Sequence, residues 1–189
     1  SAADMPTVGE KVQNPFDTLT SSASKLTPGS AGASVTWDYS FVPTSYSQID
    51  SFDLPSTTPY AASFPTATVA DTVFGTVGYT YFDTSGSAFT VVGAEQDIQG
   101  YLVAVVFKPP FLQMNFPGQY GNKSGGTSRA SIPPEAFTYT GIDSVKGTIT
   151  ITYNDTIDAW GSLTSPYGTK NVLRQKHYEF DLDSIFVHS

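Results

Sequence analysis

Helical periodicity is almost absent from this sequence, and that absence limits the chain to β architectures. Glycine, proline, serine and threonine interrupt the chain so often that few windows could sustain three helical turns. Where a regular pattern occurs, it alternates. Trp37 and Tyr39 share the apolar side of residues 35–42, and polar side chains occupy the other side, as expected of a half-buried strand. The sequence therefore predicts an all-β protein.

Turn and strand signals mark further elements in the middle of the chain. Residues 73–82 and 89–92 flank a polar turn, which predicts a hairpin. The apolar run 101–107 predicts a central strand covered on both faces. This strand is expected to stop at Pro109 and Pro110, because proline cannot donate a hydrogen bond to a sheet ladder.

Two stretches lack strand signals, and the C-terminal third has the clearest ones. Residues 63–72 are predicted to be irregular or to form a short turn, and the glycine-rich residues 118–131 are predicted to form a mobile loop. The strands predicted for the C-terminal third are 147–153, 156–163, 172–180 and 185–187, with a turn at 165–168.

Length and the spacing of these elements predict one domain that spans residues 1–189. The sequence shows no internal repeat and no linker, and 189 residues can bury a single substantial core. Several short strands separated by turns favour an antiparallel β-sandwich, jelly-roll-like or immunoglobulin-like, over a closed barrel.

Charge and composition exclude several classes of partner. The formal net charge is −8 with only nine lysines and arginines, so no cationic surface is expected for nucleic acid or anionic lipid. The sequence contains no run of about 18 apolar residues, so it predicts no membrane-spanning helix. Cysteine is absent, which removes disulfides and thiolate chemistry. The first residues, Ser-Ala-Ala-Asp, do not form a signal peptide and are interpreted as the mature end left after cleavage.

Imidazole chemistry has few candidates. The histidines are His177 and His188, and a Ser–His–acid triad would have to use His177, because His188 is the penultimate residue. The spacing predicts that His177 shares the polar face of a strand with Gln175 and Glu179. No nucleophile elbow, Walker loop or His-Glu-x-x-His motif is present, so the sequence favours a protein that is not an enzyme.

Carboxylates offer two further hypotheses, paired acids for glycoside hydrolysis and a Ca²⁺ site. The candidate acids are Glu95 with Asp97, Glu135, and the series Glu179, Asp181 and Asp183. The acids of that series alternate strictly with apolar residues, which predicts that they form the solvent-facing side of an edge strand. Asp155 and Asp158 are the candidate Ca²⁺ ligands, outside any EF-hand pattern.

Carbohydrate contact requires exposed aromatic side chains, and these could come from four tyrosines. The candidates outside the predicted strands are Tyr46, Tyr60, Tyr120 and Tyr167. Ordinary packing with the hydroxyl at the surface is the alternative for each of them. Trp37 and Trp160 are expected in the core.

A spaced pattern in the C-terminal third resembles a module found in secreted and cell-surface proteins of Bacteroidetes, of the kind exported by the type IX secretion system. The pattern consists of Gly-Thr-Ile-Thr at 147–150, Asp-Ala-Trp-Gly-Ser-Leu-Thr-Ser-Pro-Tyr-Gly-Thr at 158–169 and Asn-Val-Leu-Arg at 171–174. Similar landmarks lie at 6–9, 35–40, 64–70 and 109–112. The resemblance implies export and a surface or extracellular location, and it brings no catalytic residues. Within this pattern Arg174 is expected to have a structural role and to meet a carboxylate or backbone carbonyls.

The leading prediction is a non-catalytic extracellular or cell-surface module that serves adhesion, surface assembly or glycan contact. Its expected partners are surface glycans or other surface proteins. One alternative is a polysaccharide hydrolase that uses two of the acids named above. A third hypothesis is a structural domain stabilised by Ca²⁺, and no other cofactor is expected.

Overall fold

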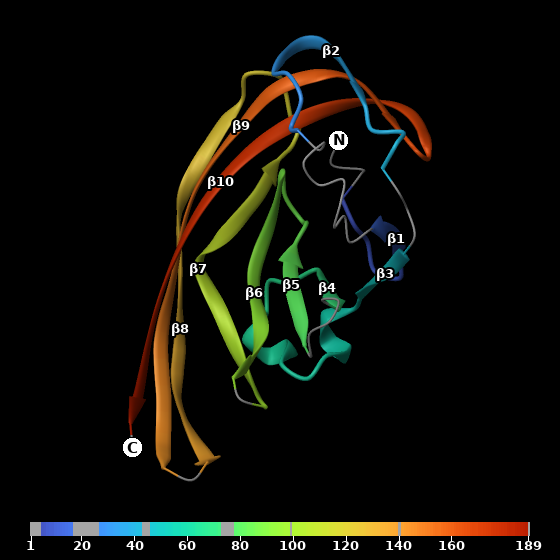
Figure 1. Ribbon diagram of the computed structural model, residues 1–189. Helices are drawn as coiled ribbons and strands as arrows, with labels where there is room; N and C mark the ends of the chain where they lie inside the picture. The colour runs from blue at the N-terminus through green and yellow to red at the C-terminus, as the bar shows by residue number, and fades with distance from the viewer. Residues whose placement is uncertain are drawn as a thin grey trace.

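The computed structural model describes residues 5–16, 27–42, 46–72, 78–98, 100–139 and 141–188. They form an all-β protein with one large, mostly antiparallel sheet of ten strands that does not close (Figure 1). The strands are β1 (Lys11–Phe16), β2 (Gly32–Asp38), β3 (Tyr46–Asp53), β4 (Val69–Thr72), β5 (Tyr79–Asp83), β6 (Ala88–Ile98), β7 (Tyr101–Asn115), β8 (Lys123–Tyr139), β9 (Ile142–Ser165) and β10 (Gly168–His188). Short 3₁₀ helices occupy Pro55–Thr57 and Ala61–Ser63. Among the described residues, none of the helices has the length and hydrophobicity needed to cross a membrane.

The strands follow the order β1-β3-β4-β5-β6-β7-β8-β9-β10, and β2 lies off this path. Strand β9 has two successive neighbours along the same side, because β8 pairs with its first part and β2 pairs in parallel with residues 159–164. Gly161 makes the approach of β2 feasible, since a Cβ there would lie only 1.8 Å from the carbonyl oxygen of Val35. Strand β10 pairs with the other side of β9.

The core lies where the long strands β8–β10 curve around the shorter ones (Figure 1). Val91 of β6 and Phe111 of β7 pack against Ile151 and Tyr153 of β9, although β9 pairs with neither β6 nor β7. The ring centroids of Phe111 and Tyr153 are 4.9 Å apart in an edge-on arrangement. The sheet therefore curls so that its own strands cover its inner face.

A smaller core cluster fills the region of β4 to β6. Phe64 stacks on Tyr81 with ring centroids 3.9 Å apart, and Ala70 and Val92 complete the cluster. The predicted hairpin is confirmed here, because β5 and β6 pair antiparallel on either side of the polar turn. Residues 69–72, predicted to be irregular or a short turn, form β4, while residues 73–77 lie outside the described part.

The strand end predicted at Pro109 and Pro110 and most of the loop predicted at residues 118–131 are instead parts of strands. Strand β7 continues through Pro109 and Pro110 to Asn115, at a place where its register with β6 shifts and a missing N–H breaks no regular ladder. Strand β8 includes much of the stretch predicted to be a loop. Gly126 lies beneath the Tyr153 side chain, whose hydroxyl would be 3.0 Å from a Cβ at that position. The glycine therefore lets the tyrosine pack against the sheet.

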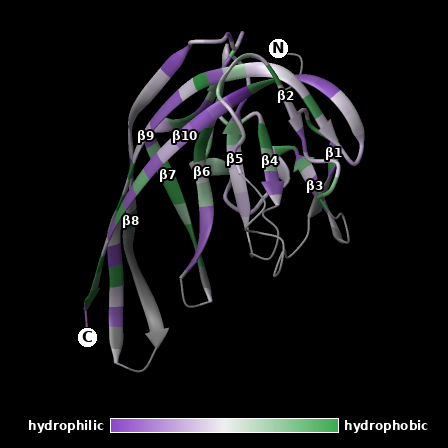
Figure 2. Ribbon diagram, turned by 45° about the horizontal axis from the view of Figure 1, so that its top comes forward, coloured by the Kyte–Doolittle hydropathy of each residue, from purple (hydrophilic) through white to green (hydrophobic). Residues whose placement is uncertain are grey.

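One irregularity decides which side chains of β10 share a face with the core. The β9–β10 register shifts between Arg174 and Gln175, where Asp158 has no partner on β10. Below this bulge, Glu179 pairs with the buried Tyr153 and Phe180 pairs with the exposed Thr152. Hydrophilic and hydrophobic residues alternate along β9 (Figure 2).

The prediction for the acidic series is therefore half right. Strand β10 is an edge strand, and Glu179, Asp181 and Asp183 are exposed. However, their side chains lie on the same face of the sheet as the buried residues of β9, because residues paired across strands point to the same side. The apolar residues Tyr178 and Phe180 are the ones that face outward.

Candidate functional site

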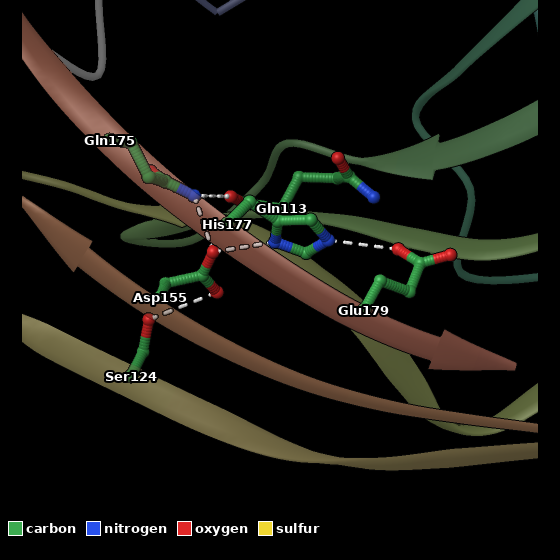
Figure 3. Close-up of polar contacts among 6 residues, drawn as sticks. All are labelled: Gln113, Ser124, Asp155, Gln175, His177 and Glu179. Atoms are coloured by element: carbon green, nitrogen blue, oxygen red, sulfur yellow. Dashed lines mark hydrogen bonds and ion pairs between the residues drawn. The ribbon is translucent and has the colours of Figure 1, made fainter. Parts of the chain in front are cut away.

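A polar network centred on Asp155 crosses three strands of the inner face (Figure 3). The residue is only 5% exposed. Its Oδ1 accepts a hydrogen bond from Gln175 Nε2 at 2.9 Å and lies 2.6 Å from His177 Nδ1. Ser124 Oγ donates to Oδ2 at 3.5 Å. The strand register places Ser124 of β8 and His177 of β10 directly beside Asp155 of β9. Strand pairing therefore brings these three residues together.

The alternation of β9 explains why this carboxylate is buried. Tyr153, Asp155 and Ile157 occupy successive inward positions, and all three are buried. A carboxylate removed from water is costly unless it is hydrogen-bonded and paired with charge. The contacts from Ser124, Gln175 and His177 satisfy that requirement.

His177 is held between two carboxylates. Its Nε2 lies 2.9 Å from Glu179 Oε2, and its Nδ1 faces Asp155. The hydrogen bond with Glu179, the one with Asp155 and the negative charge of both raise the pKa of His177 above 6.5, although partial burial opposes this. The network therefore favours the positively charged imidazole.

A pocket of about 270 Å³ opens beside Asp155. Its lining is rich in polar side chains: Asn115, Asn122, Lys123, Ser124, Asp155 and Gln175. The amides and the hydroxyl can both donate and accept hydrogen bonds, whereas the lysine donates and the carboxylate accepts. A second hollow of about 620 Å³ shares Ile157 and Gln175 with the first and has a more apolar lining that includes Met114, Phe116 and Leu173. The two hollows meet at Gln175, so a polar surface and an apolar surface adjoin.

The connectivity of the network does not activate a serine nucleophile. Such activation needs an imidazole that lies between the hydroxyl and the acid. Here the acid Asp155 lies between Ser124 and His177, and both nitrogens of His177 face carboxylates. The ring also fills the space between Asp155 and Glu179, where the glycosidic bond would have to enter for these two acids to hydrolyse it.

Two other acids predicted for hydrolysis, Glu95 and Asp97, have their hydrogen-bond partners in other parts of the molecule. Glu95 is 7% exposed in the β4–β6 region, where it accepts a hydrogen bond from the Tyr81 hydroxyl at 2.6 Å. Asp97 accepts a hydrogen bond from the backbone N–H of Gly100 at 2.6 Å, as part of a turn. Glu135 belongs to β8, and its side chain lies outside the described part.

The predicted Ca²⁺ ligands have different partners. Asp155 belongs to the network described above, whereas Asp158 accepts two hydrogen bonds from Arg174, both at 2.8 Å. Hydrogen bonding from Arg174 lowers the pKa of Asp158 below its ordinary value. Across the described ranges, no group of three or more histidine, aspartate or glutamate side chains is arranged to hold a metal ion.

Arg174 contacts both kinds of group considered for it from sequence. Besides Asp158, its guanidinium donates to the carbonyl oxygens of Pro28 at 2.6 Å and Gly29 at 2.9 Å. It also lies 5.9 Å from the ring centroid of Trp37. This arginine thus fastens the segment before β2 to the upper part of β9 and β10.

The aromatic candidates are distributed over the molecule. Tyr120 is 51% exposed and Tyr167 is 67% exposed at the β9–β10 turn. The Tyr60 hydroxyl donates to the carbonyl oxygen of Leu102, and its ring packs on the Phe64–Tyr81 cluster. Tyr46 begins β3, and its side chain lies outside the described part.

The two tryptophans differ from each other. Trp37 is buried as expected, at 6% exposed. Trp160 is 42% exposed, contrary to the core position expected for it. The reason is strand alternation, since the buried neighbours Ala159 and Gly161 take the inward positions of β9.

Sequence reasoning missed most of the polar pocket. The strand spacing places Gln175 on a polar face, but Asn115 and Asn122 carry no local signal, because the segments that carry these residues meet only in the folded chain. Asp155 did have a signal, since it interrupts an apolar row between Tyr153 and Ile157. Asp71 was also missed, and burial together with the negative charge of Asp50 raises its pKa to about 6.

The Asp155 network, the adjoining pocket and the nearby loop tyrosine are the features from which a function can be argued. Comparison with known proteins finds no match among family models, curated proteins or solved structures.

Proposed function

We propose that this protein is a non-catalytic binding module that contacts glycans through the pocket beside Asp155. The observation that carries the proposal is the lining of that pocket, where three amide side chains accompany a lysine, a serine and a buried carboxylate. Sugar hydroxyls donate and accept hydrogen bonds, and side-chain amides do both as well. A concave site with a few fixed polar groups is typical of small-molecule recognition.

The Asp155 network fixes one of these amides before a ligand arrives. Gln175 Nε2 donates to Asp155 and to the backbone carbonyl of Gln113, both at 2.9 Å. With both N–H groups used, the group that Gln175 can offer a ligand is its amide oxygen. A side chain held in place loses less conformational entropy on binding than a mobile one.

An exposed tyrosine adjoins the pocket. Tyr120 lies in the turn formed by residues 119–122, which is tied to β9 by two backbone hydrogen bonds, Gly121 N–H to Ile157 O at 2.8 Å and Ile157 N–H to Asn122 O at 2.9 Å. These bonds hold the Tyr120 segment beside the pocket residues Asn122 and Ile157. Its ring supplies a flat surface on which a sugar can stack.

The wider setting in this proposal is extracellular or at the cell surface, where adhesion and assembly with other surface proteins are the expected roles. The resemblance of the C-terminal third to Bacteroidetes surface modules supports this location. A β-sandwich architecture, jelly-roll-like or immunoglobulin-like, belongs to the same proposal. The packing of β6 and β7 against β9 supports it.

A glycan array followed by calorimetry tests the proposal. We expect Asn115→Ala and Gln175→Ala to weaken binding of the selected glycan about tenfold each, because each removes a hydrogen-bonding group from a partly desolvated site. Gln96→Ala, an exposed position of β6, is the matched control and should bind as the unaltered protein does. Absence of glycan binding, or equal loss in all three variants, would contradict the proposal. Release of reducing ends from a bound polysaccharide would instead favour a hydrolase.

A further inference from the structure

Strand β10 leaves a long open edge. Between Gln175 and His188 it pairs with β9 in continuous register, with no further shift after the bulge. In the described part of the chain, no strand pairs with its other side. The backbone N–H and C=O groups that point away from β9 are therefore available to another strand.

The two faces of this edge differ in chemistry. Tyr178, Phe180 and Leu182 project outward and are 61%, 67% and 56% exposed. Glu179, Asp181 and Asp183 lie on the opposite face, also exposed. An added strand would place its alternate side chains beside each of these rows in turn.

Neighbouring negative charges repel one another within the acidic row. Partial burial, together with the charges of Glu179 and Asp183, raises the pKa of Asp181 above its ordinary value. His177 partly offsets this repulsion, and it already lies between Asp155 and Glu179. Positive side chains on an incoming strand would relieve this repulsion.

The same charges disfavour a second copy of the chain. In a two-fold antiparallel pairing, odd-numbered residues of β10 face odd-numbered residues of the other copy. When the pair is centred on Asp181, the Glu179 of each copy faces the Asp183 of the other. Like charges directly opposite each other in a sheet are destabilising.

We propose that the Gln175–His188 edge of β10 accepts an extended segment of a different protein, in which lysine or arginine alternates with apolar residues. The cationic side chains pair with Glu179, Asp181 and Asp183. The apolar side chains cover Tyr178, Phe180 and Leu182. Backbone hydrogen bonds supply affinity, and the alternation supplies specificity.

Short synthetic peptides presented to the full chain test this proposal by fluorescence anisotropy. A peptide that alternates lysine and valine should bind about tenfold more tightly than one that alternates glutamate and valine, given three opposite-charge cross-strand pairs. It should also bind about tenfold more tightly than a lysine–valine peptide methylated on every backbone nitrogen, which has no N–H group left to donate to the ladder. Hydrogen exchange of the edge amides of β10 should slow when the unmethylated peptide binds.

A charge-reversed variant provides the second arm. Glu179→Lys, Asp181→Lys and Asp183→Lys together should switch the preference to the glutamate–valine peptide, with folding checked by circular dichroism. Equal binding of the methylated and unmethylated peptides would overturn the proposal, because attraction to an acidic protein would then suffice. A dimer in analytical ultracentrifugation that protects the same amides would also overturn it, since the occupant would be a second copy. If the variant does not fold, the comparison of peptides on the unaltered protein still tests whether an added strand binds this edge.

Discussion

The two parts of β10, above and below the bulge at Asp158, have opposite relations to the core. Above the bulge, Val172 and Arg174 pair with the buried Gly161 and Ala159. Below it, the odd-numbered Gln175 takes the inward position opposite Ile157. The upper part is fastened to the segment before β2, while the lower part forms an open edge.

This difference shows how much a single unpaired residue decides. Side chains alternate with a period of two, so one extra residue on β9 exchanges the inward and outward rows of everything below it on β10. If the register above the bulge continued without a shift, Tyr178 and Phe180 would pair with the buried Asp155 and Tyr153. The bulge therefore brings His177 to Asp155 and leaves the apolar row exposed.

Deletion of Asp158 should have the largest effect, because it removes the bulge itself. The pairs Arg174–Ala159 and Gln175–Ile157 then follow each other directly, and Ile157 and Ala159, both buried in the native protein, become neighbours that must point to opposite faces. One part of the two strands therefore turns its inward row outward, and Arg174 loses its carboxylate. We expect a loss of at least about 4 kcal/mol in the free energy of unfolding, measured in urea. Asp158→Ala is the matched control, since it removes only the ion pair. An equal loss in both variants would show that the ion pair, and not the reversal of inward and outward side chains, accounts for the loss of stability.

Replacement of Arg174 should be the next largest change. Arg174→Met removes the paired hydrogen bonds to Asp158 and those to the carbonyls of Pro28 and Gly29, at a site where the arginine side chain is 22% exposed. The expected loss is about 2 kcal/mol in the same assay, since hydrogen bonds to charged groups are the stronger ones. Arg129→Met, at an exposed position of β8, should stay within about 0.5 kcal/mol. A similar cost for both arginines would remove the distinction between the two parts of β10.

A smaller and pH-dependent effect is expected at His177. Because its pKa is raised in the folded protein, its contribution to stability is fully present below the ordinary value of 6.5 and is lost as pH rises through the raised value. Melting temperature should therefore fall above pH 6.5 in the unaltered protein, and this fall should be weaker in His177→Asn. Asp71 also lowers stability as pH rises, but in the lower window between 3.8 and about 6.

The control for this pH series is His188→Asn. His188 is largely exposed, with 76% of its side chain accessible, where it contacts Asp143. Its variant should keep the slope of the unaltered protein above pH 6.5. Parallel melting curves for His177→Asn and the unaltered protein would contradict the charged role of His177.

The smallest effect is expected for Phe180→Thr. The ring is 67% exposed on the outward row, opposite the exposed Thr152, so its removal should change the free energy of unfolding by less than about 0.5 kcal/mol. Thermal unfolding of the isolated protein measures this. A loss above about 1 kcal/mol would mean that the outward row is covered, and the comparison between the two parts of β10 would need revision.

Local patterns predicted the parts of this fold that depend on few neighbours. Alternation identified the strand that carries Trp37, and a polar turn identified the β5–β6 hairpin. They failed at β7, where Pro109 and Pro110 sit inside a strand with shifted register, and at β8, where Gly126 makes room for Tyr153. In both cases the deciding group belongs to a neighbouring strand.

The sequence by itself determined that the chain is β-rich, acidic and without cysteine chemistry, because those properties follow from composition and short-range periodicity. Only the tertiary structure decided which row of β10 faces inward, and thereby which residues meet at Asp155. The physical reason is that strand register is set by pairing over a long distance in the chain, and a shift of one residue reverses every side chain.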